Sequence, residues 1–127
     1  MMTVDIMRAV MERQLELQTK HFGVDVTELQ GVERANYVQA MALALNIEVG
    51  EALQEIAWKP WATSDHFHRE AYLMELIDVL HFWMNLVLVA TDDPEVLHDV
   101  YMRKAYENER RQREGYSGND KCPECGR

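Results

Sequence analysis

Two short acidic motifs carry the side chains of this sequence that are best placed to take part in a reaction. The first is EVGE, which contains Glu48 and Glu51, and the second is ELID, which contains Glu75 and Asp78. Residues three or four apart lie on the same face of a helix. Each motif therefore predicts two carboxylates side by side, and Asn85 extends the polar face of the second pair.

Both pairs border apolar sequence, where an unpaired charge is costly to bury. Two such helices packed face to face would bring four carboxylates around one point, and these cannot all ionise unless cations compensate them. All-oxygen ligand sets suit hard divalent cations such as Mg²⁺ or Mn²⁺, and protein-bound Mg²⁺ commonly meets substrate phosphates. Alone, the first pair also fits a solvated helix face, and the second fits ion pairs with buried Arg or Lys. The conjunction of both pairs predicts a metal site that handles nucleotides.

The last predicted helix supplies the opposite charge. Lys104, Asn108 and Arg111 continue an apolar stripe of that helix at helical spacing. Such a stripe indicates a helix that packs at one end and lines a cleft at the other, where Arg111 suits bidentate contacts with phosphates. A basic, solvated helix end, which is favourable with the helix macrodipole, explains the same pattern. The residues alone leave both interpretations open.

Gln14 is a polar residue on the apolar stripe of the first predicted helix. Its amide offers both a donor and an acceptor, which suits contact with the edge of a nucleobase. The alternative is a core glutamine whose amide is satisfied by a backbone carbonyl, and the sequence does not decide between the two.

The spacing of apolar residues predicts four long helices and no strands. The expected helices cover residues 3–21, 32–58, 65–90 and 94–113. Ser64 or Asp65 is the expected N-cap of the third helix, and Pro94 suits the first turn of the fourth. We therefore predict an all-α protein, a four-to-five-helix bundle of one domain over residues 1–116, followed by a flexible tail at 117–127.

Composition and charge restrict the class of protein. The formal net charge of −9 at pH 7 argues against general binding to nucleic acid or to anionic membranes. The apolar stretch at 71–90 is about as long as a membrane span. Its Glu75, Asp78 and His81 count against insertion, so we expect a core helix and no membrane partner. Residues 1–10 lack a long apolar run, so we expect no signal peptide.

The two cysteines, Cys122 and Cys125, form a CPECG motif in the tail. Two adjacent cysteines do not suggest a secreted disulfide framework, which favours a cytoplasmic location. Their spacing is that of half a zinc site. One chain cannot complete a four-cysteine site, so Zn²⁺ would have to be shared by two tails in an oligomer. A disordered tail is the alternative.

EVGE followed after 23 residues by ELID resembles the ExxE…ExxD pattern of the all-α nucleoside triphosphate pyrophosphatases, the MazG-like superfamily. Within this superfamily, KAYENERRQREGY is similar to the closing motif of the dimeric dUTPases. WKPW after the first acidic motif and DVLHF after the second add to the likeness, which covers roughly residues 8–116.

This resemblance implies Mg²⁺-dependent hydrolysis of a nucleoside triphosphate, with dUTP giving dUMP and pyrophosphate. Glu48 or Glu51 would also orient or deprotonate the attacking water. The metal ligands that it implies are Glu48, Glu51, Glu75 and Asp78. The substrate contacts that it implies are Lys104 and Arg111 at the phosphates, with Gln14, Trp61, Asn108 and Tyr116 around the rest of the nucleotide. Short members of the superfamily complete their bundles by association, so we expect a homodimer or a tetramer.

One departure from the family motif concerns the substrate. Ala105 stands where members usually have Asn directly after the motif lysine. The substrate could therefore also be dCTP, a purine triphosphate or a modified nucleotide. Two other classes stay open: a nucleotide-binding module without catalysis, and an acidic helical interaction protein whose polar face is a buried ion-pair network. Retention of all four carboxylates and of Lys104 and Arg111 favours the enzyme.

Overall fold

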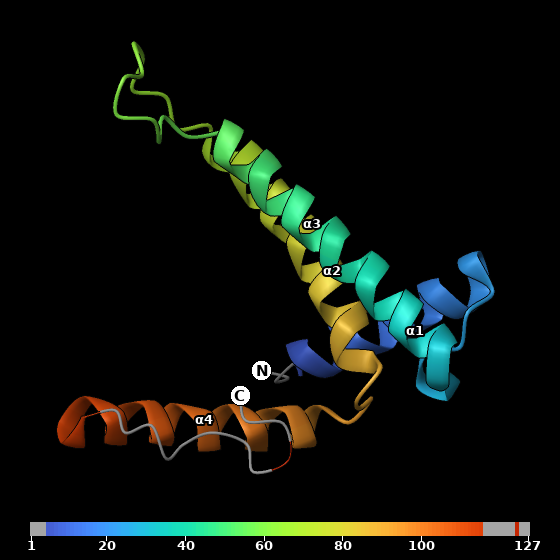
Figure 1. Cartoon of the computed structure of the whole chain (residues 1–127). Coiled ribbons are helices and arrows are strands. Elements are labelled where there is room, and N and C mark those ends of the chain that lie inside the picture. The colour runs from blue at the N-terminus through green and yellow to red at the C-terminus, as the bar shows by residue number, and fades with distance from the viewer. Residues whose placement is uncertain (1–4, 116–123, 125–127) are drawn as a thin grey trace, which may run out of the picture. The chain divides into compact units, whose positions relative to one another are not determined.

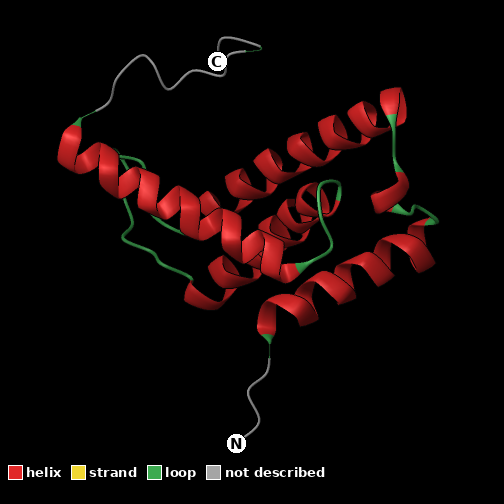
Figure 2. Cartoon of the chain, turned by 90° about the horizontal axis from the view of Figure 1, so that it is seen from below, coloured by secondary structure: helices red, strands yellow, loops and turns green. Residues whose placement is uncertain are grey.

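A computed structural model describes residues 5–115 and residue 124 of the chain (Figure 1). In this part of the chain the secondary structure is helical, without a strand (Figure 2). The elements are α1 (Ile6–Phe22), a 3-10 helix η1 (Val26–Glu28), α2 (Gly31–Gln54), α3 (Arg69–Leu88) and α4 (Pro94–Glu114). The prediction of an all-α fold is confirmed. The chain divides into two compact units, Met1–Pro94 and Glu95–Arg127.

Local sequence signals account for both ends of α1. Asp5 is the N-cap, and its side chain accepts a hydrogen bond from the backbone N–H of Arg8. Gly23 follows the last turn with φ 66°, a left-handed conformation that glycine adopts without the steric cost of a Cβ. The backbone N–H of Val24 then donates to the carbonyl of Gln18 and closes the helix end.

The connection between α2 and α3 is longer than the sequence predicts. The helix expected over 32–58 ends at Gln54, and the one expected over 65–90 begins at Arg69. The intervening chain forms an antiparallel bridge between Ile56 and Phe67, so the backbone groups needed to extend both helices are used across the loop. In this bridge Ala57 N–H donates to the carbonyl of His66, and His68 N–H donates to that of Glu55.

The predicted N-cap of the third helix is therefore wrong. The residue at this position is His68, which makes no side-chain capping hydrogen bond. Ser64 lies in the loop instead, where its Oγ is 2.8 Å from Nδ1 of His66, and Asp65 also lies outside the helix. Because the bridge includes Phe67, α3 begins only at Arg69, after both residues.

Within the first unit, α2 and α3 lie side by side along their lengths and are joined by this loop at one end (Figure 1). Helix α1 and η1 pack against α3. The core is a cluster at the opposite end of α3 from the loop, and its buried members are Met11, Val26, Met84 and Leu88. Apolar contact between α1, η1 and the last turns of α3 thus holds the unit together.

Much of the apolar surface of α2 and α3 is exposed in the single chain. The buried residues of α3 are Met84, Asn85 and Leu88. The expectation of a core helix is therefore wrong for the first half of α3 in one chain, where Leu73, Met74 and Ile77 are exposed. By length and composition α3 is the one helix among the described residues that could cross a membrane, a test that core helices of other proteins also pass.

Replacing Met84 by Ala should destabilise the first unit by about 2–5 kcal/mol, because Met84 is fully buried and its loss leaves a cavity in the core. Urea unfolding at one protein concentration would measure the change. The control is Met7→Ala on the more exposed side of α1, which should cost less than about 1 kcal/mol. Equal losses for the two variants would contradict this assignment of the core.

Candidate metal centre

Three carboxylates meet where α2 and α3 face each other. Glu48 and Glu51 are one helical turn apart on α2, and Glu75 comes from α3. One carboxylate oxygen from each lies within 4.8 Å of the other two. The structure thus joins the two acidic motifs, separated by 23 residues in sequence, into one cluster.

The cluster carries more negative charge than its own hydrogen bonds satisfy. Oε2 of Glu48 and Oε2 of Glu75 are buried and have no hydrogen-bond partner. Burial, the adjoining carboxyl of Glu51 and the charges of Asp78 and Glu75 raise the pKa of Glu48 to about 7. Burial and the charge of Glu51 likewise raise the pKa of Glu75. Each shift reflects charge without compensation in a poorly solvated site.

Asp78 lies beside this cluster without joining the group of three. Its negative charge contributes to the raised pKa of both Glu48 and Glu75, so it is close to them. Its Oδ1 is also 3.9 Å from Nδ1 of His81, one turn further along α3. The role of Asp78 as a fourth ligand stays a prediction.

The donor set suits a hard divalent cation. Three carboxylates supply only oxygen ligands, which Mg²⁺ and Mn²⁺ prefer. The unpartnered oxygens of Glu48 and Glu75 are buried polar atoms of the kind that native proteins normally satisfy. A cation between the three side chains would satisfy both oxygens and remove the repulsion. Glu48, Glu51 and Glu75 are therefore the residues that would hold it.

Gln14 is buried, but its partner is not the backbone carbonyl that the sequence suggests as an alternative. Its Nε2 donates to Oδ1 of Asn85 on α3 at 2.7 Å. Asn85 in turn donates from Nδ2 to Sδ of Met41 on α2 at 3.3 Å. The sequence predicts Asn85 as part of the polar face of α3. The contact of Met41 with Asn85 has no signal in the sequence, because Met41 follows the ordinary apolar pattern of α2.

Trp61, the other residue of the first unit that the sequence predicts to contact substrate, lies in the loop between α2 and α3 and is 74 % exposed. The same loop holds a polar cluster that the sequence does not predict. His66 and His68 stack with ring centroids 5.0 Å apart, and Nδ1 of His68 is 2.9 Å from Oε2 of Glu55. Their alternate spacing in HFH is the signal that an extended segment, rather than a helix, occupies this position.

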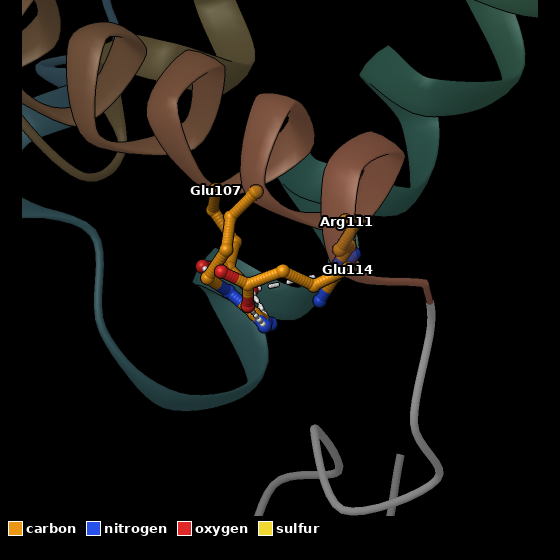
Figure 3. Close-up of polar contacts among 4 residues, drawn as sticks. Glu107, Arg111 and Glu114 are labelled. Atoms are coloured by element: carbon orange, nitrogen blue, oxygen red, sulfur yellow. Dashed lines mark hydrogen bonds and ion pairs between the residues drawn. The ribbon is translucent and has the colours of Figure 1, made fainter.

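Lys104, Asn108 and Arg111 lie on α4, in the second unit. Figure 3 shows that Arg111 belongs to a group of charged side chains on this helix. Its Nε is 3.4 Å from Oε1 of Glu107, and Glu107 also accepts hydrogen bonds from Nε and Nη2 of Arg110. These arginines, Arg110 first, lower the pKa of Glu107. Contact of Arg111 with phosphate stays a prediction.

Three residues named from the sequence lie outside the described part of the chain. They are Tyr116, Cys122 and Cys125. Closure of Tyr116 over the nucleotide and a shared zinc site at the two cysteines remain predictions from the sequence.

The paired helices and their carboxylate centre define an all-α protein whose residues suit metal-dependent chemistry on phosphates. A sequence model of a family described as dUTPase matches residues 6–97. This chain therefore belongs to the dUTPase family, and its activity falls in the general class of nucleotide pyrophosphatases. The match covers all three clustered carboxylates and ends before Lys104. Comparisons with characterised proteins and with solved structures gave no match.

Stabilisation of the protein by Mg²⁺ should increase with pH. The pKa of Glu48 is raised above its ordinary value of 4.5 to about 7. Without a cation, the proton that Glu48 retains in the folded state contributes to stability. This contribution is fully present below about pH 4.5 and is lost as the pH rises through 7. Mg²⁺ must displace the retained proton, so it competes better at high pH. Thermal unfolding with Mg²⁺ and with EDTA, at one pH below 7 and one above, would measure this difference.

The control is Glu33→Gln on the exposed first turn of α2, which should keep the pH dependence. Glu48→Gln should reduce it, since the titrating group is gone. An identical Mg²⁺-induced shift in Tm at both pH values for the natural protein would contradict the assignment.

Proposed function

We propose that this chain is a Mg²⁺-dependent nucleoside triphosphate pyrophosphohydrolase that converts dUTP into dUMP and pyrophosphate. The observation that carries the proposal is the carboxylate cluster of Glu48, Glu51 and Glu75, with two buried oxygens that lack partners, inside the segment that matches the dUTPase family. dUTP is the substrate that the family favours, and Mg²⁺ is the cation that suits an all-oxygen site used with phosphates.

The three glutamates differ in exposure, which suggests different roles. Glu48 and Glu75 each have one buried carboxylate oxygen without a hydrogen-bond partner, which makes them suited to hold the cation. Glu51 is exposed, so the attacking water can reach its carboxylate, which would orient the water and accept its proton. When bound, Mg²⁺ would polarise the phosphate and neutralise charge on the departing pyrophosphate.

The substrate contacts in this proposal come from the sequence motifs. Lys104 and Arg111 would bind the phosphates, as cations that can compensate their charge. Asn108 and Tyr116 would contact the nucleotide, and Trp61 would form a wall of the base pocket. Gln14 would contact the edge of the base. We also propose a cytoplasmic location, where a nucleotide pool is available, and a protein that binds neither nucleic acid nor membrane.

Replacing Glu51 by Gln should lower kcat about 10²–10⁴-fold, the usual effect of removing a general base, with a smaller change in the Mg²⁺ concentration that gives half-maximal rate. Glu75→Gln should instead raise that concentration at least about tenfold, since a ligand is lost. Pyrophosphate release from dUTP during a Mg²⁺ titration would measure both effects.

Glu33→Gln is the matched control, because Glu33 lies on α2 outside the cluster. It should leave the rate and the Mg²⁺ dependence unchanged. Full activity in EDTA, or full activity of both cluster variants, would refute the metal-dependent mechanism.

We propose in addition that the protein is a homo-oligomer, either a dimer or a tetramer. Large apolar side chains on both helices of the site are exposed in one chain. They are Leu43, Ile47, Val49 and Leu53 on α2, with Leu73, Met74, Leu76, Ile77 and Trp83 on α3. Large exposed apolar side chains gathered on two paired helices favour an interaction site there. A second copy of the chain would cover it and complete the helical bundle.

Leu43→Glu should weaken self-association at least about tenfold, because burying a leucine contributes about 1.5–3 kcal/mol and a charge cannot replace it. Leu43 is well exposed in the single chain, so the substitution should not disturb the fold of the monomer. The control is Gln39→Glu, one turn earlier on α2 and also exposed. Analytical ultracentrifugation over a range of concentrations would decide, and a natural protein that stays monomeric would contradict the proposal.

A further inference from the structure

A chain of buried polar side chains links the three helices of the first unit. Gln14 on α1 is 4 % exposed and Asn85 on α3 is 2 % exposed. Gln14 Nε2 donates to Asn85 Oδ1 at 2.7 Å, and Asn85 Nδ2 donates to Met41 Sδ at 3.3 Å. Burial makes the direction of each hydrogen bond consequential, since few alternative partners are present.

Met41 sets that direction. A thioether sulfur accepts hydrogen bonds and cannot donate them. Asn85 must therefore turn its NH₂ group toward Met41, which leaves its Oδ1 facing Gln14. Gln14 must then present its NH₂ group to Asn85, and its Oε1 is directed away from this pair. The opposite orientation of both amides would place Asn85 Oδ1 against the sulfur and lose a hydrogen bond.

The oriented oxygen of Gln14 is available to a ligand. No described residue donates a hydrogen bond to Gln14 Oε1. Among the described residues, the fully buried side-chain oxygens that lack a hydrogen-bond partner are Glu48 Oε2 and Glu75 Oε2. Gln14 Oε1 is not among them, so it keeps some contact with solvent. The small exposed part of Gln14 therefore includes its acceptor.

The position along α3 suits a nucleotide that starts at the carboxylates. Asn85 follows Glu75 of the cluster by ten residues, about 15 Å along α3, and it follows the neighbouring Asp78 by seven residues, about two helical turns on the same face. A nucleotide whose phosphates lie at the cluster can extend its base over a similar length. Gln14, held by Asn85, lies at the corresponding end.

We propose that Met41 and Asn85 are positioning residues that fix the amide of Gln14 with its acceptor toward the base. This inference rests on the proposed function. The acceptor selects bases whose Watson–Crick edge carries a ring N–H, as in uracil, and rejects cytosine, which has a ring nitrogen acceptor there. A polar site that leaves a buried group unpaired discriminates strongly between such analogues.

The test is Met41→Leu, which removes the sulfur acceptor and conserves volume. Calorimetry would measure the binding of dUMP and dCMP, and pyrophosphate release would give kcat/KM for dUTP and dCTP. The ratio of dUMP to dCMP affinity should fall about fivefold, as expected for the loss of one ordinary hydrogen bond. The change should come mainly from tighter binding of dCMP, because the flipped amide is no longer disfavoured. A merely structural role would weaken both ligands together.

The matched control is Met11→Leu, a buried methionine of the core whose side chain makes no hydrogen bond to either amide. It should leave the ratio unchanged. Asn85→Leu should lower the ratio as well, with thermal unfolding used to confirm that the variant is folded. Gain of dCMP affinity in Met41→Leu supports the proposal.

An unchanged ratio in Met41→Leu, or a natural protein that prefers dCMP, would overturn the positioning role. These outcomes are distinct from a failure of the proposed function. A natural protein that releases no pyrophosphate from any triphosphate but binds dUMP selectively, with that selectivity reduced in Met41→Leu, would refute the enzyme while supporting the role of Met41 and Asn85.

Discussion

Repulsion between carboxylates is the constraint on which the arrangement of α2 and α3 depends. Glu48, Glu51 and Glu75 bring one oxygen each within 4.8 Å of the others, at a place where burial already disfavours charge. The two helices can remain paired there only if protons or a cation compensate the cluster. The repulsion between the carboxylates destabilises the site without a cation and favours the binding of a divalent ion. The stability of the helix pair and the chemistry of the site are therefore coupled.

The rest of the first unit holds these two helices in register. At one end, the backbone bridge between Ile56 and Phe67 closes the loop. At the other, the apolar cluster of Met11, Val26, Met84 and Leu88 ties α1 and η1 to α3. The pair of Gln14 and Asn85 lies at this same end, and Asn85 is next to Met84 of the cluster in sequence. A buried amide pair requires a specific alignment of its helices, whereas apolar contacts alone tolerate sliding.

The position of the small core explains why apolar faces of α2 and α3 are exposed. The cluster that stabilises α1 uses only the last turns of α3, so the half of α3 that carries Glu75 packs against α2 while its other apolar side chains stay exposed. The carboxylate centre therefore lies in the part of the unit where intrachain packing is weakest. Association with a second copy would both bury this surface and lower the solvation of the carboxylates, which strengthens their interaction with a cation.

From the sequence alone one can predict the all-α fold, the end of α1 near residue 22, the start of α4 and the pairing of carboxylates within each motif, whereas α1 begins at Ile6 and not at the expected residue 3. These features depend on helical periodicity and on residues a few positions apart, such as Glu48 with Glu51. The end of α2 and the start of α3 depend instead on a contact across the loop, because the Ile56–Phe67 bridge competes with the helices. Tertiary structure also brings Gln14 to Asn85 and Glu75 to the α2 pair. Those contacts join atoms far apart in sequence, and packing between helices, rather than local preference, determines them.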